Sequence, residues 1–372
     1  MSVTSAVLLR NRIEFKSIID QSITSKLNQP KVSICVPARN EEKVIEKCVR
    51  SLLNQSYENF EILVLDDNSE DSTPSILQHL NIEFDHLTII QGQPKPDDWL
   101  GKSWACHQLS QKTTGDILIF LDADVWMHSN ILTKAVSKLE EIDVLTIWPQ
   151  QKVQSFLEKL VVPTIYFSLL TLLPVVYVER SPRWMPKFLS PLVDPKFVAA
   201  CGQFIAFKKS AYDSIDGHRG VKNEIVEDVE LARRLKNTTY TISMMNGIGG
   251  VYCRMYTSGS ETWDGFQKNF LAGFGNLFEF VFMAILHFLF FLFPIYLFVN
   301  AIIKNDSLVL LLSGSIISVY IVQRLILNFW FKWDWWMALL HPVAVIWFEV
   351  LGIKCMTNHI FGLKSIWKGR SV

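Results

Sequence analysis

The amino-acid sequence predicts an α/β fold, a doubly wound and mostly parallel sheet, followed by apolar helices that span a membrane. Between residues 31 and 151, short runs rich in β-branched residues alternate with helical stretches, which is typical of βαβ units. Of the 372 residues, 49% are hydrophobic and 19% are charged, and the apolar excess lies beyond about residue 277. The sequence therefore predicts a globular region joined to a membrane region.

The first 30 residues are expected to form an amphipathic segment that lies on the membrane surface. Charged residues, among them Arg10, Arg12 and Lys16, interrupt the apolar ones, so the uncharged core of a signal peptide is missing and secretion is not expected. One face of a short helix would carry Val7, Leu8, Leu9, Ile13, Phe15, Ile18 and Ile19. An ordinary packing helix explains the same pattern equally well.

The globular domain is predicted to cover residues 31–277 and to begin with four parallel strands. The strand candidates are residues 32–36, 61–65, 87–90 and 116–121, and each is followed by polar or turn residues and then a helix-like segment. Further strands near 197–207, 239–244 and 250–256 and a charged helix over 224–236 complete this domain. In such a sheet a ligand binds beyond the carboxyl ends of the strands.

An apolar insertion at about residues 155–195 interrupts the globular domain. Its apolar run, 160–178, contains Pro163 and Pro174 and is borderline in length, because a bilayer crossing needs about 20 apolar residues. A crossing here would also place later polar motifs on the opposite side of the membrane. We therefore expect an interfacial or re-entrant hairpin.

Three apolar segments, 278–303, 308–328 and 335–356, form a predicted transmembrane region over residues 278–358. Tryptophans lie where an aromatic belt is expected, at Trp330, Trp333, Trp335 and Trp336. Three crossings would separate the tail, 359–372, from the catalytic domain. However, the tail carries Lys364, Lys368 and Arg370, which favour the cytoplasmic side. The number of true crossings stays open, and 335–356 is the first candidate for a re-entrant segment because it contains His341, Pro342 and Glu349.

Charge and cysteine content restrict the partners and the compartment. The net charge is zero, with 36 basic and 36 acidic residues, so no basic field is present for nucleic acid. The six cysteines form neither a CxxC pair nor a cluster with zinc-ligand spacing. Reduced thiols fit a catalytic domain on the cytoplasmic face of an integral membrane protein.

Acidic residues gather where the predicted strands end, in the segments 37–42, 66–69 and 122–124. Crowded carboxylates repel one another unless a cation or ligand donors compensate, which points to a site. Asp122 and Asp124 follow a buried strand and lie two residues apart, which suits Mg²⁺ or Mn²⁺ held together with phosphate oxygens. An isolated Asp-x-Asp triplet is more often a surface turn, but this triplet has matching partners upstream.

Taken together, these motifs resemble glycosyltransferase family 2, the inverting enzymes of GT-A fold, and the resemblance covers nearly the whole chain. The matching segments are Pro37-Ala38-Arg39-Asn40-Glu41-Glu42, Val64-Leu65-Asp66-Asp67-Asn68-Ser69, Trp99-Leu100-Gly101-Lys102, Gly115-Asp116, Asp122-Ala123-Asp124 and Val226-Glu227-Asp228. Three later segments resemble the branch that glycosylates carotenoids and related polyisoprenoid lipids: Arg254-Met255-Tyr256, Trp263-Asp264-Gly265-Phe266 and Trp367-Lys368-Gly369-Arg370.

The resemblance implies a role for each matching position. The nucleotide-sugar would contact Pro37, Ala38, Glu41, Asp66, Asp67, Lys102, Asp122, Ala123 and Arg254, with Asp66 and Asp67 in the uridine pocket and Asp122 near the ribose or sugar. Asp124 would hold Mn²⁺ or Mg²⁺. Lys102 and Arg254 would steady the diphosphate, although Arg254 is equally well explained as an ion-pairing strand residue.

Asp228 is the expected general base. An inverting transfer needs a carboxylate that takes the acceptor proton while the anomeric carbon is attacked from the opposite face. Glu227 and Asp228 open a predicted helix, whose dipole favours an ionised base. The competing interpretation is that both acids merely cap this helix.

The sequence thus predicts a metal-dependent enzyme that moves one sugar, glucose or a relative, from a UDP-sugar to a membrane lipid such as a carotenoid. Processive members of the family carry a Gln-x-x-Arg-Trp element after the base, and its absence from this sequence favours single transfer. One alternative acceptor is a polyprenyl phosphate. A catalytically silent membrane scaffold of the same fold is the alternative from another class.

Overall fold

The computed structural model describes most of the chain, in two compact units. The described residues are 2–23, 29–84, 86–182, 185–186, 188–189, 193–194, 197–271, 273, 277–363, 366–367 and 370–371. The sheet unit comprises Ile13–Lys152 and Val175–Met255, and the helical unit comprises Met1–Arg12, Val153–Pro174 and Tyr256–Val372. Each unit is described by itself.

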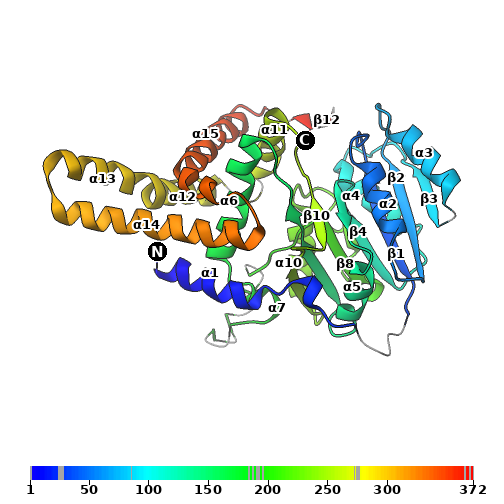
Figure 1. Ribbon diagram of the computed structural model, residues 1–372. Coiled ribbons are helices and arrows are strands. Elements are labelled where there is room, and N and C mark those ends of the chain that lie inside the picture. Colours follow the sequence, from blue (N-terminus) through cyan, green and yellow to red (C-terminus); the bar gives the residue numbers. More distant parts are fainter. Residues whose placement is uncertain are drawn as a thin grey trace. The chain divides into compact units, whose positions relative to one another are not determined.

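The sheet unit is built on seven strands in the order β3-β2-β1-β4-β8-β6-β9 (Figure 1). Their bounds are β1 Val32–Ala38, β2 Phe60–Asp66, β3 Leu87–Gln91, β4 Ile117–Leu121, β6 Val144–Trp148, β8 Phe204–Lys208 and β9 Ile242–Asn246. β8 runs antiparallel to β4 and β6, and the other pairings are parallel. The four predicted strands and the mostly parallel sheet are confirmed.

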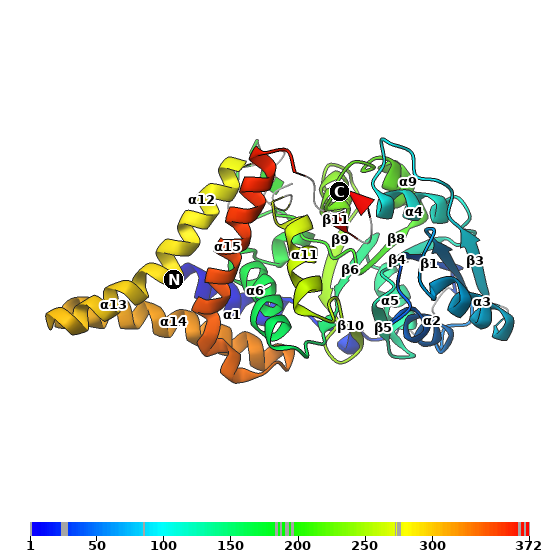
Figure 2. The ribbon, with the colours of Figure 1, turned by 90° about the horizontal axis from the view of Figure 1, so that it is seen from above.

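Helices cover both faces of this sheet, which explains why its central strands are apolar almost throughout. α2 (Ile45–Leu53), α3 (Thr73–Glu83) and α5 (Ile131–Leu139) lie on one face, and α4 (Gly101–Ser110) and α9 (Lys209–Ser214) lie on the other (Figure 2). Every residue of β4 is buried. The buried strands form a rigid base from which the loops at their carboxyl ends project.

A second, three-stranded sheet follows the acidic triplet. It contains β5 (Val125–Met127), β10 (Val251–Cys253) and β7 (Gln150–Gln151), in the order β5-β10-β7. Between these strands the chain forms the short helices η3 (Gly217–Arg219) and α7 (Val176–Glu179) and the helix α10 (Glu227–Lys236). The triplet is thus held in a turn between two sheets.

The strand expected near 197–207 is shorter in the structure, because β8 begins only at Phe204. Two backbone N–H groups just before it bind side chains instead of a neighbouring strand. The N–H of Cys201 donates to Thr146 Oγ1 at 2.8 Å, and that of Gly202 donates to Asp228 Oδ2 at 2.6 Å. Because these N–H groups bind side chains and not a neighbouring strand, residue 202 lies at the site described below.

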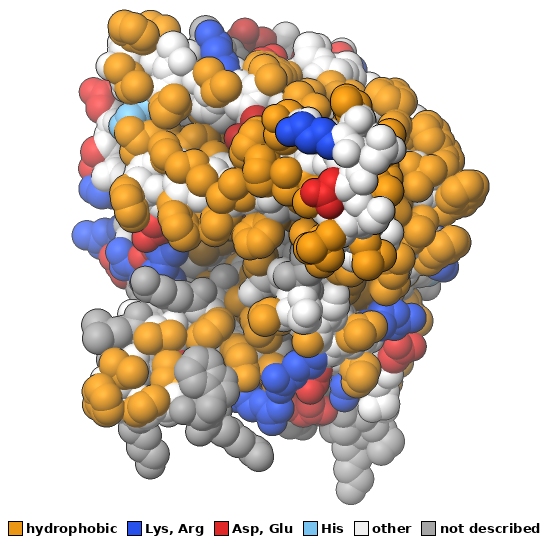
Figure 3. Space-filling view, turned by 90° about the vertical axis from the view of Figure 1, so that its left-hand side faces the viewer, with side chains coloured by type: hydrophobic (Ala, Val, Ile, Leu, Met, Phe, Trp, Pro, Cys, Tyr) orange, Lys and Arg blue, Asp and Glu red, His pale blue; other side chains and the backbone are white. Residues whose placement is uncertain are grey.

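The helical unit contains three helices that are long and apolar enough to cross a membrane, judged by length and composition. They are Leu277–Lys304, Ser307–Phe331 and Trp335–Ile360. The first consists of α12 (Leu277–His287), the π-helical segment η5 (Phe288–Leu292) and α13 (Phe293–Lys304). The second is α14 (Ser307–Phe331). The third joins η6 (Trp335–Leu340) to α15 (His341–Ile360). Apolar side chains dominate the face that carries α13 and α14 (Figure 3). These helices coincide with the three predicted apolar segments.

The apolar insertion forms one continuous helix, α6 (Phe156–Leu172), rather than the expected hairpin over 160–178. Ser155 and Glu158 form a capping box at its start, and Pro163 lies inside it. In the same unit, α6 packs with α11 (Gly259–Phe270) and α15 in one apolar cluster. Burial of α6 against these helices stabilises the continuous helix.

The N-terminal segment also differs from the expected single apolar face. α1 (Ser2–Glu14) buries Leu8 but leaves Leu9 and Ile13 exposed. Phe15 and Ile18 are buried, but they follow the end of the helix. The apolar residues therefore do not share one helical face. In the tail, Lys364, Lys368 and the Arg370 side chain lie outside the described residues, and β11 (Ile366–Trp367) pairs with β12 (Arg370–Ser371).

Candidate active site

The carboxyl ends of β1, β2 and β3 are joined by backbone hydrogen bonds. Ala38 lies opposite Asp66 in the strand register, and the N–H of Asp67 donates to the Ala38 carbonyl at 2.8 Å. The Asp66 carbonyl accepts the N–H of Gly92 at 2.8 Å. A Cβ at position 92 would lie 2.9 Å from that carbonyl, so glycine is required for this close approach.

Asp66 and Asp67 are buried, with 3% and 5% of their surface exposed. Asp66 Oδ1 accepts the N–H of Ser69 at 3.1 Å, which turns the chain back after β2. Glu41 lies on the loop after β1, where its N–H donates to Thr73 Oγ1 at 2.8 Å. The structure therefore brings Ala38, Asp66 and Asp67 together at one edge of the sheet, as the sequence predicts.

The triplet Asp122-Ala123-Asp124 forms the turn between β4 and β5. The Asp122 N–H donates to the Gln203 carbonyl at 3.2 Å, and the Asp124 carbonyl accepts the N–H of Arg254 at 3.4 Å. Arg254, the residue after β10, therefore lies beside Asp124. The Asp122 side chain is 28% exposed and reaches the neighbouring pocket.

The buried Cys48 thiol lies close to three of these carboxylates. Burial raises its pKa well above the ordinary value, and the negative charges of Asp124, Glu41 and Asp122 raise it further. The Cys253 thiol behaves in the same way, because burial and a hydrogen bond with the Asp124 carboxyl raise its pKa. Both thiols are therefore inert packing groups beneath the acidic edge.

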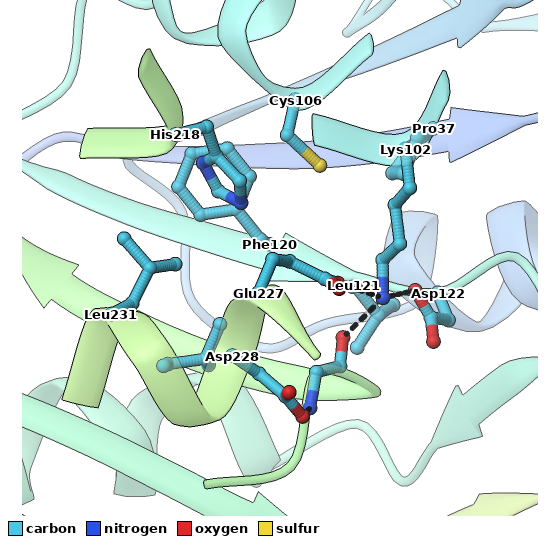
Figure 4. Close-up of a pocket in the computed structure, with 12 residues that line it drawn as sticks. Pro37, Lys102, Cys106, Phe120, Leu121, Asp122, His218, Glu227, Asp228 and Leu231 are labelled. Carbon is cyan, nitrogen blue, oxygen red and sulfur yellow. Dashed lines mark hydrogen bonds and ion pairs between the residues drawn. The ribbon is translucent and has the colours of Figure 1, made fainter. Parts of the chain in front are cut away.

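Lys102, in the first turn of α4, is the centre of an ion cluster. Its Nζ lies 2.8 Å from Asp122 Oδ1 and 2.9 Å from Glu227 Oε1, and it donates to the Gly202 carbonyl at 3.4 Å (Figure 4). Burial alone would lower the pKa of Lys102, but the charges of Asp122 and Glu227 outweigh that effect and raise it well above its ordinary value. The side chain is therefore a permanent cation.

Asp228 lies in the first turn of α10, next to this cluster. Its Oδ2 accepts the N–H of Gly202 at 2.6 Å, and its Oδ1 accepts the N–H of Val229 at 2.8 Å. Burial raises the pKa of Asp228 to about 6, and Glu227 contributes in the same direction, while Lys102 and the two N–H donors oppose the shift. The carboxyl group consequently changes its charge close to neutral pH.

Four of the predicted site residues line a single pocket. They are Pro37, Lys102, Asp122 and Asp228, and the other lining residues are Cys106, Phe120, Leu121, Gly202, Ile205, His218, Glu227 and Leu231. The volume open to water inside it is about 10 Å³, roughly that of one water molecule. The remaining predicted residues, Ala38, Glu41, Asp66, Asp67, Ala123, Asp124 and Arg254, do not line this pocket.

The structure adds residues to which the sequence gave no role. Glu227 is buried and binds Lys102, and its only sequence signal is its position next to Asp228. His218 lies in the back wall, where its Nδ1 is 2.8 Å from the Tyr212 hydroxyl and its ring packs 4.5 Å from Phe120. Burial lowers the pKa of His218 to about 3, so the ring is neutral. Nothing in the sequence distinguishes this histidine.

The acidic triplet is compatible with a divalent cation only if a ligand shares the coordination. Within the described ranges, no group of three or more His, Cys, Asp or Glu side chains could hold a metal ion. Mg²⁺ and Mn²⁺ nevertheless bind through one or two carboxylates when water and phosphate oxygens complete the shell. The oxygen donors of Asp122 and Asp124 fit that arrangement.

Comparison with known proteins agrees with this architecture. Residues 33–168 match the family model described as glycosyl transferase family 2. The chain is 28% identical over 278 residues to 4,4'-diaponeurosporenoate glycosyltransferase of Staphylococcus haemolyticus. This alignment covers 73% of this chain and 69% of that protein. The chain is 41% identical over 109 residues to beta-monoglucosyldiacylglycerol synthase of Trichormus variabilis, but this match spans only 29% of this chain and 23% of that protein.

A solved structure shares the fold. The mannosyltransferase PcManGT from Pyrobaculum calidifontis, determined in complex with GDP-Man and Mn²⁺, aligns with a TM-score of 0.56 and 16% identity. The alignment covers 97% of this chain and 95% of that one. The matched family region, residues 33–168, contains β1 to β4 and the acidic triplet.

Proposed function

We propose that this chain, a family 2 glycosyltransferase of GT-A fold that resembles the carotenoid-associated enzymes, transfers one sugar from a UDP-sugar to a membrane lipid. Glucose is the proposed sugar and a carotenoid or related polyisoprenoid the proposed acceptor. The names of the two relatives support a lipid acceptor, since one is named for diaponeurosporenoate and the other for diacylglycerol. The three candidate spans would keep such an amphiphile and the enzyme in the same bilayer.

The observation that carries this proposal is the placement of Asp228 beside the ion cluster of Lys102, Asp122 and Glu227. In the proposed step, Asp228 takes the proton of a hydroxyl or carboxyl group of the lipid, and the oxygen of that lipid group forms a bond to the anomeric carbon. The bond from that carbon to the UDP oxygen breaks, and UDP leaves with the electron pair, which inverts the configuration. A pKa of about 6 suits a base that must be ionised near neutral pH.

The donor is proposed to lie along the edge formed by Pro37, Ala38, Glu41, Asp66 and Asp67, with its sugar toward Asp122. Because the pocket holds only about one water molecule, Lys102 must release one of its carboxylates before the sugar can enter. The released ammonium would then face the diphosphate. Arg254 is proposed to bind the same group from the other side of Asp124.

A bound Mn²⁺ or Mg²⁺ would neutralise charge on the leaving diphosphate, and Asp124 is its proposed ligand. Single transfer remains our proposal because the sequence lacks the Gln-x-x-Arg-Trp element. We also propose that the catalytic domain faces the cytoplasm. The thiols of all six cysteines are buried and free, which suits a reducing compartment.

The test is transfer in isolated membranes that contain the chain. Radiolabelled UDP-glucose is offered with extracted carotenoids, hopanoids, sterols or polyprenyl phosphates, and the labelled lipid is identified. Label in a carotenoid or related lipid that survives mild acid supports the proposal, whereas an acid-labile product indicates a polyprenyl phosphate acceptor. If neither UDP-glucose nor another UDP-sugar is hydrolysed or transferred, with or without Mn²⁺, the catalytic proposal fails and a scaffold is favoured.

A further inference from the structure

The helical unit contains a cluster of buried polar side chains that belongs to no part of the proposed active site. It consists of Tyr320 and Arg324 on α14 and of His341, the first residue of α15. Their exposed surface is 0%, 0% and 1%, respectively. All three lie in candidate membrane spans, where a buried ionisable group usually has a function.

Arg324 has no counter-charge in the part of the chain that the structure describes. Its Nη1 donates to Thr164 Oγ1 at 3.1 Å and its Nη2 to the Leu160 carbonyl at 3.3 Å, while its Nε has no hydrogen-bond partner. The Leu160 carbonyl also accepts the Thr164 hydroxyl at 3.3 Å, so it is shared. A fully buried cation with two neutral acceptors is strongly destabilising unless an anion compensates it.

His341 and Tyr320 add polar atoms without hydrogen-bond partners next to this cation. Both ring nitrogens of His341 and the hydroxyl of Tyr320 are buried without a hydrogen-bond partner. The two rings lie 5.6 Å apart, and Phe167 and Phe291 pack against His341 at 4.6 Å and 4.9 Å. Arg324 lies one turn after Tyr320 on the same helix. Three polar groups therefore converge inside an aromatic wall.

The start of α15 contributes to the same region. This 20-residue helix continues directly from η6, where the His341 N–H donates to the Ala338 carbonyl, and it brings the His341 ring beside that of Tyr320. Pro342 occupies the first turn, where its missing N–H costs no hydrogen bond. A guanidinium, an imidazole and a phenol together form a set of donors suited to an anion.

We propose that this cluster, Tyr320, Arg324 and His341, binds the anionic oxygen group, phosphate or carboxylate, of a membrane lipid. Arg324 lies seven residues before the end of α14, which is about 10 Å along a helix. Beyond that end, Asp334 forms an ion pair of 2.8 Å with Lys159, and Trp335 and Trp336 are exposed, as expected at a headgroup layer. A lipid oxygen group therefore reaches the depth of Arg324 more readily than a free anion does.

Binding requires a rotamer change, because the unpaired atoms are closed off from the surface. The bond from Arg324 Nη2 to the shared Leu160 carbonyl is the contact that Arg324 gives up most easily. The guanidinium would keep its bond to Thr164 and turn its other edge toward the lipid oxygens. The proposal depends on the membrane location of the helical unit and not on glycosyl transfer.

Thermal unfolding of the full chain, purified in a non-ionic detergent, tests the proposal. We expect phosphatidylglycerol or oleate to raise Tm above the value in diacylglycerol, which carries no anionic oxygen, and inorganic phosphate alone to have little effect. Arg324→Met should abolish this difference, and native mass spectrometry should show retention of phosphatidylglycerol reduced about tenfold or more. Stabilisation by phosphatidylglycerol but not oleate identifies a headgroup phosphate, and the reverse identifies a carboxylate.

Arg12→Gln is the matched control, because Arg12 is an exposed arginine of the same unit that lies 5.0 Å over Trp330. It should keep the lipid-dependent Tm shift. Should Arg324→Met fail to fold, Arg324→Lys and His341→Phe replace it, and both should weaken the shift. Equal stabilisation by diacylglycerol and phosphatidylglycerol, or an unchanged shift in these variants, overturns the proposal. An active-site variant, Asp228→Asn, should retain the shift, which separates this test from that of the proposed reaction.

Discussion

Lys102 and Asp228 are held together through one residue, because the Gly202 N–H donates to Asp228 Oδ2 at 2.6 Å while the Gly202 carbonyl accepts from Lys102 at 3.4 Å. A Cβ at position 202 would lie 3.0 Å from Lys102 Nζ and 3.2 Å from Asp228 Oδ2. A side chain at this position would therefore push both groups away by a few tenths of an ångström. The cation and the proposed base therefore respond to each other's charge, and the predictions below use this coupling.

Replacing Asp228 with asparagine should remove the general base and leave the pocket intact. We expect Asp228→Asn to lower kcat for sugar transfer by about 10²- to 10⁴-fold, the usual contribution of a positioned base. UDP binding, measured by calorimetry on the detergent-solubilised chain, should change little, since Asp228 lies at the acceptor side of the proposed reaction. Normal transfer by this variant would show that another group is the base.

The rate of transfer should fall as the pH is lowered through about 6. Asp228 acts as a base only when ionised, and its pKa is raised from 3.8 to about 6. Below that value the ionised fraction, and with it kcat/KM, should decrease about tenfold per pH unit. The measurement is a profile of kcat/KM from pH 4.5 to 8, and a rate that stays constant down to pH 4.5 contradicts the assignment.

Glu227→Gln should shift this profile to lower pH. The negative charge of Glu227 is one of the two causes that raise the pKa of Asp228, so its removal leaves burial alone opposed by Lys102 and the backbone donors. Glu230→Gln is the control, because Glu230 lies on the same helix and pairs with Arg233 and Arg234 outside the pocket. A shift to higher pH, or an equal shift in both variants, would contradict the arrangement.

The strands, and the acidic residues at their carboxyl ends, could be predicted because each is recognised from a short stretch of sequence. Each of β1 to β4 is a short apolar run followed by a polar turn, and parallel strands necessarily bring their carboxyl ends, such as those before Asp67 and Asp122, to one edge. Asp228 was assigned through the resemblance of Val226-Glu227-Asp228 to the family, and its position at the start of a helix supports that assignment. In each case a short segment carries enough information.

The pairing of Lys102 with Glu227 could not be predicted, because it joins α4 to α10 across 125 positions of sequence and depends on how both helices pack on the sheet. The role of His218 was missed for the same reason. Its neighbours Tyr212 and Phe120 come from separate elements, and nothing in its own segment indicates that it is buried. The hairpin expected over 160–178 was wrong for residues 160–172, which belong to one helix that tertiary packing sustains through Pro163.

Asp124→Ala should weaken the dependence of UDP binding on Mn²⁺. If Asp124 is a ligand of a cation shared with the diphosphate, Mn²⁺ should tighten UDP binding to the wild-type chain, and EDTA should abolish the effect. In the variant, calorimetry with and without Mn²⁺ should give nearly equal affinities. Asp143→Ala, which removes a carboxylate that pairs with Lys208 at 3.0 Å, should preserve the response to Mn²⁺. A full response in Asp124→Ala would place the cation elsewhere.

Lys102→Met separates the two functions proposed for the central cation. Without the positive charge, the pKa of Asp228 should rise, because Lys102 is the leading influence that lowers it, and the fall in kcat/KM should begin at higher pH. KM for the UDP-sugar should also increase, since no ammonium faces the diphosphate. Lys209→Met removes an exposed lysine that lies 3.7 Å from Asp213 and should change neither quantity. If KM increases while the pH profile stays fixed, Lys102 contacts the donor without changing the pKa of Asp228. If instead the pH profile moves while KM stays fixed, Lys102 serves only to hold the carboxylates together.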